Sequence, residues 1–265
     1  MLEQIVAKAP LYFLIAARVF AMILTVPLLS TAAVSRVAKI ALAGYTAYIL
    51  MSQISYSVWN VDPYSLDYVL LVIGEGLIGI ITGFYVSMLF AAFSSAGQFF
   101  TYQMGFGASE VYDSLSQIEN PLMGQYLNLL AMLLFLQVKG FQKLFLGGVL
   151  RSFESLNCYV LLEAKNTFLT FLLSGLTKLF FDAMMIALPI IGTLFLISIS
   201  TGLLSKAAPQ MNLLSEGLPT TILCAFFLLT VLLPSMCNYF ERCFTAAFVR
   251  LEDLFAKISP LVAPL

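Results

Sequence analysis

The composition of this chain is that of a membrane protein. Of its 265 residues, 61% are hydrophobic and 10% are charged, the mean hydropathy is +0.97 and the formal net charge is −1. Soluble globular chains carry about 25% charged residues, so the soluble, disordered and nucleic-acid-binding classes are disfavoured. We expect an all-α integral membrane protein or the buried subunit of a membrane complex.

Six apolar stretches follow one another along the chain. They cover approximately residues 10–29, 37–51, 66–93, 122–150, 168–200 and 218–248. A helix needs about 20 residues to cross the hydrocarbon core, and the last four stretches are longer than that. Pro189 and Gly192 are expected to kink or break the fifth stretch, and the C-terminal region is expected to form a helical hairpin.

The ionisable side chains inside these apolar stretches include Arg18, Glu75, Lys178 and Asp182. A charge at the centre of a lipid-facing helix costs about 2.5–3.5 kcal/mol, so these positions are expected to face protein or water. Lys178 and Asp182 are four residues apart and can pair with each other or with a neighbouring helix. Whether Arg18 pairs with Glu75 is left open. Near Glu75, the spacing of Gly79 and Gly83 predicts close helix packing.

The pattern of basic residues conflicts with six simple membrane crossings. No lysine or arginine occurs from Ile40 to Val138, although this range contains acidic residues. Positive charge marks the cytoplasmic side, yet strict alternation cannot place the connections on both sides of the third stretch outside. Either the third stretch is a re-entrant hairpin, or the protein does not cross the bilayer in the ordinary way.

No catalytic or metal-binding motif is present. Histidine is absent, which excludes Ser-His and Cys-His catalysis and histidine metal sites. The four cysteines have no C-x-x-C spacing and are interpreted as packing residues: Cys158, Cys224, Cys237 and Cys243. We predict no enzymatic activity and no cofactor.

A polar turn near the C-terminus resembles a known family. Gly202 to Asn212, with its Pro209-Gln210-Met211-Asn212 core and the following Gly217-Leu-Pro219, resembles the signature turn of the FliR family of flagellar export-gate proteins. Injectisome counterparts share the Pro-Gln-x-Asn core, and Ala207 favours the flagellar branch. Further family features occur in order along nearly the whole chain: Arg18 with Pro27, Lys39 to Ala43, Gly74 to Gly79, Gln103-Met104-Gly105, Asp113 and Asn120-Pro121.

The resemblance implies a core subunit of the type III protein export gate, with long, tilted and broken helices in hairpins. It would form part of a closed channel for unfolded flagellar proteins, in the bacterial inner membrane at the flagellar basal body. Residues 1–170 would resemble a larger FliP-like partner, and the hairpin 171–265 a small FliQ-like partner. The FliP-like and FliQ-like proteins are expected partners of this chain. An FlhB-like export switch protein and the unfolded export substrates are expected to bind it as well.

The resemblance also assigns roles to individual residues. Segment 94–121 would be a plug that closes the channel, and the sealing residues would be Met104, Gly105, Phe106, Gly107, Tyr112 and Asp113. Many relatives read Phe-Ala-x-Phe-Val-Asp-Pro there, whereas this chain has Ala108, Val111 and Ser114 at the two Phe positions and the Pro. Four charged side chains would be buried and would take part in assembly of the gate: Arg18, Glu75, Lys178 and Asp182. The hairpin turn would use Lys206, Pro209, Gln210 and Asn212.

Other functions remain alternatives. Segment 94–121 could be an ordinary exposed loop, although its length is typical of functional or disordered segments. A secondary transporter of a small solute, with a broken helix near Pro189, predicts two matching halves, and none are evident. An intramembrane protease would need a Ser-Lys or two-Asp arrangement, and no motif surrounds Asp113 or Asp182.

Overall fold

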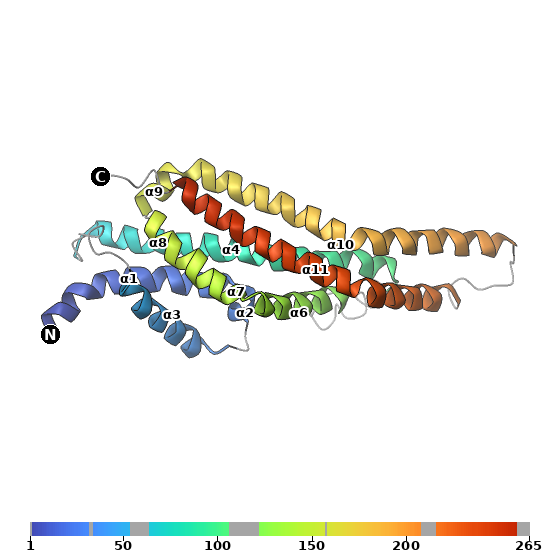
Figure 1. Cartoon of the computed structure of the whole chain (residues 1–265), viewed down its shortest axis with the longest axis horizontal. Helices are drawn as coiled ribbons and strands as arrows, with labels where there is room; N and C mark the ends of the chain where they lie inside the picture. Colours follow the sequence, from blue (N-terminus) through green and yellow to red (C-terminus); the bar gives the residue numbers. More distant parts are fainter. Residues whose placement is uncertain are drawn as a thin grey trace. The chain divides into compact units, whose positions relative to one another are not determined.

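Every element that the structure describes is a helix or a turn (Figure 1). The computed structural model describes residues 2–31, 34–53, 64–105, 122–156, 158–207 and 216–258. These ranges contain no strand, which confirms the all-α expectation. They include four helical segments long and apolar enough to cross a membrane: Lys8–Thr25, Leu66–Gln103, Lys165–Ala207 and Leu218–Ile258. A fifth span results if Leu122–Gln137 and Gly140–Phe153 are counted as one broken segment.

The chain forms two compact units. The first unit comprises Met1–Met88, Lys139–Gly175 and Ala246–Leu265, and the second comprises Leu89–Val138 and Leu176–Thr245. Three long helices contribute residues to both units: α4 (Leu66–Gln103), α10 (Lys165–Ala207) and α11 (Leu218–Ile258). The expected likeness of residues 1–170 and 171–265 to two partner proteins is a different division and remains a prediction.

A proline separates the first two helices of the first unit. α1 (Leu2–Thr25) gives way to α2 (Pro27–Ser30) at Val26, whose φ of −73° and ψ of 123° are extended. The ring of Pro27 disfavours helical geometry at the preceding residue, while proline itself suits the first helical position. α3 (Arg36–Met51) begins after Ser35, whose hydroxyl oxygen accepts a hydrogen bond from the Ala38 N–H, and it packs against α1.

α4 is a single helix of 38 residues, about 57 Å long at 1.5 Å per residue. The alternative of a re-entrant hairpin in the third apolar stretch is therefore wrong. α4 also continues past the predicted apolar stretch. Positions 94–103 of the predicted plug segment are consequently helical rather than part of a loop.

The fourth apolar stretch contains a break that its hydropathy does not indicate. α6 (Leu122–Gln137) is followed by Lys139, whose φ of 56° and ψ of 40° are left-handed. The chain then continues as α7 (Gly140–Gln142), the π-helix η2 (Lys143–Leu150) and α8 (Arg151–Ser155). Leu156 is extended, and α9 (Cys158–Glu163) follows. This irregular run places α8 and Leu156 within the first unit.

α10 and α11 run antiparallel in the second unit, as the predicted C-terminal hairpin requires. Tyr239 of α11 contacts Asp182 of α10, and Leu232 lies with Pro189 around one small pocket. The helix α10 continues through Pro189, so of the kink or break predicted there, the break is wrong. A proline removes one backbone hydrogen bond, a loss that long helices in apolar surroundings tolerate. α10 buries one stripe at helical spacing: Ala183, Ala187, Ile190 and Leu194.

Candidate functional site

A buried cluster around Arg18 joins three segments of the first unit. Arg18 of α1 is 2% exposed and Glu75 of α4 is 0% exposed. The Arg18 Nε donates a hydrogen bond to Glu75 Oε2 at 2.6 Å. Its Nη1 donates to Ser152 Oγ and its Nη2 to the Leu156 carbonyl oxygen, both at 2.9 Å. The guanidinium carbon lies 3.8 Å from the centre of the Phe153 ring. The pairing that the sequence left open is therefore present.

This ion pair makes the packing of α1, α4 and α8 interdependent. Removing one partner of a buried ion pair costs about 3–5 kcal/mol, because the remaining charge is left without compensation. Arginine suits the position, since its planar guanidinium offers five N–H donors to three separate acceptors. Glu75 Oε1 is buried and has no hydrogen-bond partner among the described residues. The Arg18 guanidinium is thus the group that compensates this carboxylate.

Two glycines let α1 and α4 approach closely beside the ion pair. A Cβ on Gly79 would lie 2.2 Å from the Arg18 carbonyl oxygen. A Cβ on Gly83 would lie 1.8 Å from Thr25 Oγ1. A Cβ on Gly76, in contrast, would meet nothing within 4 Å. The packing predicted for the small-residue spacing is confirmed at Gly79 and Gly83.

Cys158 of α9 lies against the same part of α4. A Cβ on Gly74 would lie 2.1 Å from Cys158 Sγ, so the two helices touch at this point. Burial and, to a smaller extent, the charge of Glu75 raise the pKa of the Cys158 thiol. A thiol with a raised pKa is a poor nucleophile near neutral pH. Its place in this contact fits the packing role predicted for the cysteines.

A second polar cluster lies between α10 and α11 in the second unit. Lys178 Nζ donates a hydrogen bond to Asp182 Oδ1, and the Tyr239 hydroxyl donates to the same oxygen at 2.8 Å. Asp182 is 4% exposed. The i,i+4 spacing predicted that the two charges could pair, whereas no sequence signal indicated Tyr239. Across the described ranges, no group of three or more Cys, Asp or Glu side chains is placed to hold a metal ion.

Two of the predicted sealing residues, Met104 and Gly105, directly follow the end of α4. Met104 is fully buried, and Gly105 has a φ of 87°, in the left-handed region that favours glycine. A Cβ on Gly105 would also lie 2.7 Å from Leu218 Cδ2 of α11. Because α4 ends at Gln103, these two residues turn the chain at the point where the remaining predicted plug begins.

Several predicted site residues fall outside the part of the chain that the structure describes. They are Phe106, Gly107, Tyr112 and Asp113 of the plug, and Pro209, Gln210 and Asn212 of the turn motif. Lys206 lies in the last turn of α10. α10 ends at Ala207 and α11 begins at Leu218, so the motif falls between the two helices of the hairpin.

An aromatic cluster within the second unit was not predicted. The Phe93 and Phe240 rings stack with centroids 3.9 Å apart. Phe244 lies 5.3–5.5 Å from Phe90, Phe93 and Phe135. The sequence contained a signal for this cluster. Phe90 and Phe93 are three residues apart and Phe240 and Phe244 are four residues apart, so each of these two pairs lies on one face of its helix. Such ring pairs contribute about 0.5–1.5 kcal/mol beyond their buried area and fix α4, α6 and α11 together.

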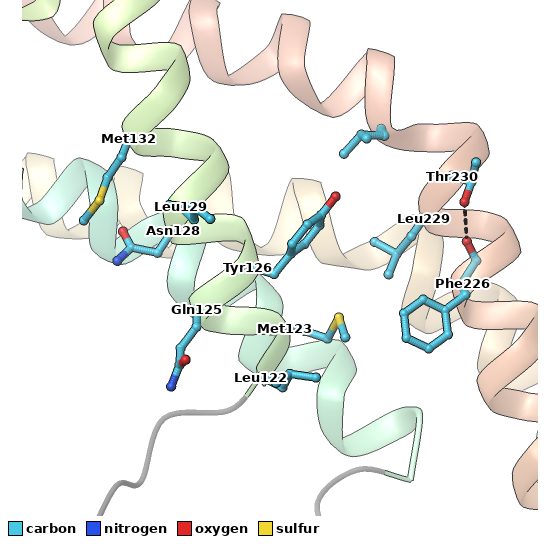
Figure 2. A pocket seen from close by; sticks show the side chains of 11 residues that line it. Leu122, Met123, Gln125, Tyr126, Asn128, Leu129, Met132, Phe226, Leu229 and Thr230 are labelled. Atoms are coloured by element: carbon cyan, nitrogen blue, oxygen red, sulfur yellow. Dashed lines mark hydrogen bonds between the residues drawn. The ribbon is translucent and has the colours of Figure 1, made fainter.

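A pocket of about 760 Å³ opens between α6 and α11 of the second unit (Figure 2). Tyr126 and Met123 point from α6 towards Phe226 and Leu229 of α11 in Figure 2. Its lining is mostly apolar and includes no charged side chain. Asn128 Oδ1 is buried without a hydrogen-bond partner among the described residues. The pocket therefore offers mainly apolar contact rather than acid–base chemistry.

Comparisons with known proteins give one consistent result. Residues 9–247 match the family described as bacterial export proteins, family 1. The chain is 30% identical to the flagellar biosynthetic protein FliR of Escherichia coli (strain K12), over 98% of each chain. It is 28% identical to FliR of Bacillus subtilis (strain 168), over 97% of this chain and 99% of the relative. It is 27% identical to the surface presentation of antigens protein SpaR of Shigella flexneri, over 59% and 60%.

Proposed function

Because the chain belongs to the FliR family of bacterial export proteins, we propose that it is a core subunit of a flagellar type III protein export gate. In this role it forms part of a closed channel for unfolded flagellar proteins and catalyses no reaction. The observation that carries the proposal is the family match, which extends from residue 9 to residue 247 and so includes both units.

The proposed partners are a larger FliP-like subunit, a small FliQ-like subunit and an FlhB-like switch protein. The assembly would lie in the bacterial inner membrane at the flagellar basal body. The FliR proteins of Bacillus subtilis and Escherichia coli match over 99% and 98% of their length, whereas the injectisome relative SpaR matches over 60% of its length. This difference favours the flagellar assignment.

The surface of α10 supports a role inside an assembly. In the second unit this helix exposes about half of each of many large apolar side chains, among them Phe180, Phe181, Met185, Leu188, Phe195, Leu196 and Leu203. Such a surface needs lipid or a partner to cover it. Lys178, which pairs with Asp182, is 32% exposed on the same helix, and a charged group is costly against hydrocarbon. Partner helices that cover α10 and meet this charge with polar groups would satisfy both features.

The end of α4 supports the plug assignment for segment 94–121. A seal must stay closed at rest and give way to a passing chain. The buried side chain of Met104 packs in the second unit directly after the helical part of the segment, and Gly105 permits a backbone conformation that other residues rarely adopt. Methionine and aromatic side chains beyond that point supply bulk that can be displaced.

Affinity purification tests the assignment to the gate. The tagged full chain, extracted from membranes in mild detergent, should recover the larger and the small gate subunits in defined proportions. Leu196→Gln with Leu203→Gln should reduce this recovery, because both side chains are exposed on α10. Ser200→Gln on the same part of α10 is the matched control and should leave recovery unchanged, since Ser200 is already polar and exposed. A stable lone monomer from wild-type membranes would contradict the proposal.

A further inference from the structure

A second, polar pocket lies in the first unit, between the start of α10 and the end of α11. Its volume is about 630 Å³. The α10 wall carries Asn166, Thr170 and Ser174, which are four residues apart and therefore share one helix face. The α11 wall carries Arg250, Asp253 and Lys257, which also recur at helical spacing. Two polar stripes thus face each other across this pocket.

Aromatic side chains form part of the lining of this pocket. The Tyr85 and Phe171 rings are 4.5 Å apart, and the Tyr85 hydroxyl donates a hydrogen bond to the Ala247 carbonyl oxygen at 3.2 Å. A Cβ on Gly175 would lie 3.3 Å from the Tyr85 ring, so these walls are in contact. The pocket is therefore a built feature of the first unit.

The charges of the pocket favour an anion. Arg250 and Lys257 each carry a positive charge, and Asp253 carries one negative charge, so the pocket is net positive. Neither cation forms an ion pair with an acidic side chain among the described residues. The Thr170 and Ser174 hydroxyls donate to carbonyl oxygens of their own helix. The donors available to a ligand are therefore chiefly the two cations and the Asn166 amide.

The surroundings of the pocket suit a lipid headgroup. α10 has 43 residues, about 65 Å at 1.5 Å per residue, and is longer than a bilayer of about 40–45 Å. Leu169 directly precedes Thr170, and Leu173 directly precedes Ser174. Both leucine side chains are more than half exposed. Apolar surface suited to acyl chains thus adjoins the polar pocket. Basic pockets between helices at the cytoplasmic side bind anionic headgroups.

We propose that this pocket, with Arg250 and Lys257 as its cationic groups, binds the phosphodiester headgroup of an anionic phospholipid of the phosphatidylglycerol type. Asp253 weakens this binding through its negative charge. The bound lipid would fasten the basic ends of α10 and α11 to the membrane surface. This proposal requires a membrane location and is independent of the proposed gate function.

Native mass spectrometry of the full chain in non-ionic detergent measures the binding. Phosphatidylglycerol should bind more tightly than phosphatidylcholine. Arg250→Gln with Lys257→Gln should weaken phosphatidylglycerol binding by roughly 25-fold, from about fivefold for each basic side chain near an anionic surface. Arg36→Gln with Arg242→Gln removes the same charge at exposed positions outside the pocket and should change it less than about twofold.

Asp253→Asn supplies a test that loss of folding cannot imitate. Removal of this negative charge should strengthen phosphatidylglycerol binding by roughly fivefold. Equal effects of the two double variants, equal binding of phosphatidylcholine, or no gain with Asp253→Asn would each overturn the proposal. Displacement of the lipid by an equal concentration of inorganic phosphate would instead assign the pocket to a free anion.

A photo-reactive residue at Thr170 identifies the occupant of the pocket in cells. Irradiation should yield an adduct with the mass of a phospholipid on the peptide that contains position 170. Leu188, an exposed position of α10 in the second unit, provides the comparison site. A covalent link from position 170 to another protein would show that the pocket is a protein interface and would overturn the lipid proposal.

Discussion

Separating Arg18 from Glu75 should destabilise the first unit more than the loss of either side chain's volume would. Arg18→Met removes the donor that compensates Glu75 and leaves a buried carboxylate without its partner. Glu75→Met leaves the guanidinium of Arg18, which is 2% exposed, without its carboxylate. Its remaining acceptors, Ser152 Oγ and the Leu156 carbonyl oxygen, are neutral. Each single change should cost about 3–5 kcal/mol.

The double variant Arg18→Met with Glu75→Met should be more stable than either single variant. Replacing a buried ion pair by apolar side chains of similar volume is often close to neutral, because both desolvation costs disappear together. The Ser152 hydroxyl keeps its hydrogen bond to the Val149 carbonyl oxygen at 2.7 Å, so it is not left without a partner. The double-mutant cycle therefore isolates the interaction between the two charges.

The measurement is the temperature at which the detergent-solubilised chain loses its monodisperse peak in size-exclusion chromatography. One kcal/mol corresponds to about 2–4 °C for a chain of this size, so each single variant should lose roughly 6–20 °C. Additive losses in the double variant would refute the reasoning. They would show that the two side chains stabilise the unit independently.

Three further changes test other contacts of the structure. Gly79→Ala should cost about 1–3 kcal/mol in thermal stability, because its Cβ must move about 1.2 Å from the Arg18 carbonyl oxygen to reach an ordinary 3.4 Å contact. Gly76→Ala on the same helix should be neutral or stabilising by up to about 1 kcal/mol, and equal effects would argue against close packing at Gly79. Tyr239→Phe should cost about 1–2 kcal/mol by the same assay through loss of its hydrogen bond to Asp182, and an unchanged unfolding temperature would contradict that role. In a single-cysteine variant, Cys158 should react with maleimide more slowly at pH 8 than free cysteine does, because its pKa is raised, and the reaction should become faster as the pH rises. A rate equal to that of free cysteine would contradict the raised pKa of this partly buried thiol.

The sequence predicted the helices well where hydrophobicity alone determines them. α3 and the starts of α4 and α11 agree with the apolar stretches, because a long apolar run in this composition has few alternatives to a helix. The break at Lys139 was missed, since lysine rarely adopts a left-handed conformation and its side chain gives no signal for it. Of the kink or break predicted at Pro189, the break was wrong, because a single proline removes one backbone hydrogen bond and does not end a long apolar helix.

The candidate site could be predicted only in part, for a related reason. The cost of burying charge indicated that Arg18 and Glu75 face protein, but they are 57 residues apart and their contact depends on the fold. The same holds for Tyr239 and Asp182, which meet only because α10 and α11 run antiparallel. The i,i+4 pair of Lys178 and Asp182, in contrast, is local and was predictable from helix geometry alone.

The proposed role as part of a closed protein channel is tested most directly by the ion permeability of cells that express a plug deletion. Deleting residues 105–113 should make the cells leaky to ions and small dyes while the assembled complex is still recovered with its partner subunits. Deleting residues 54–62, an equal length from the connection between α3 and α4, is the control and should leave the membrane tight. An assembled complex that lacks residues 105–113 and is as tight as wild type would contradict the account.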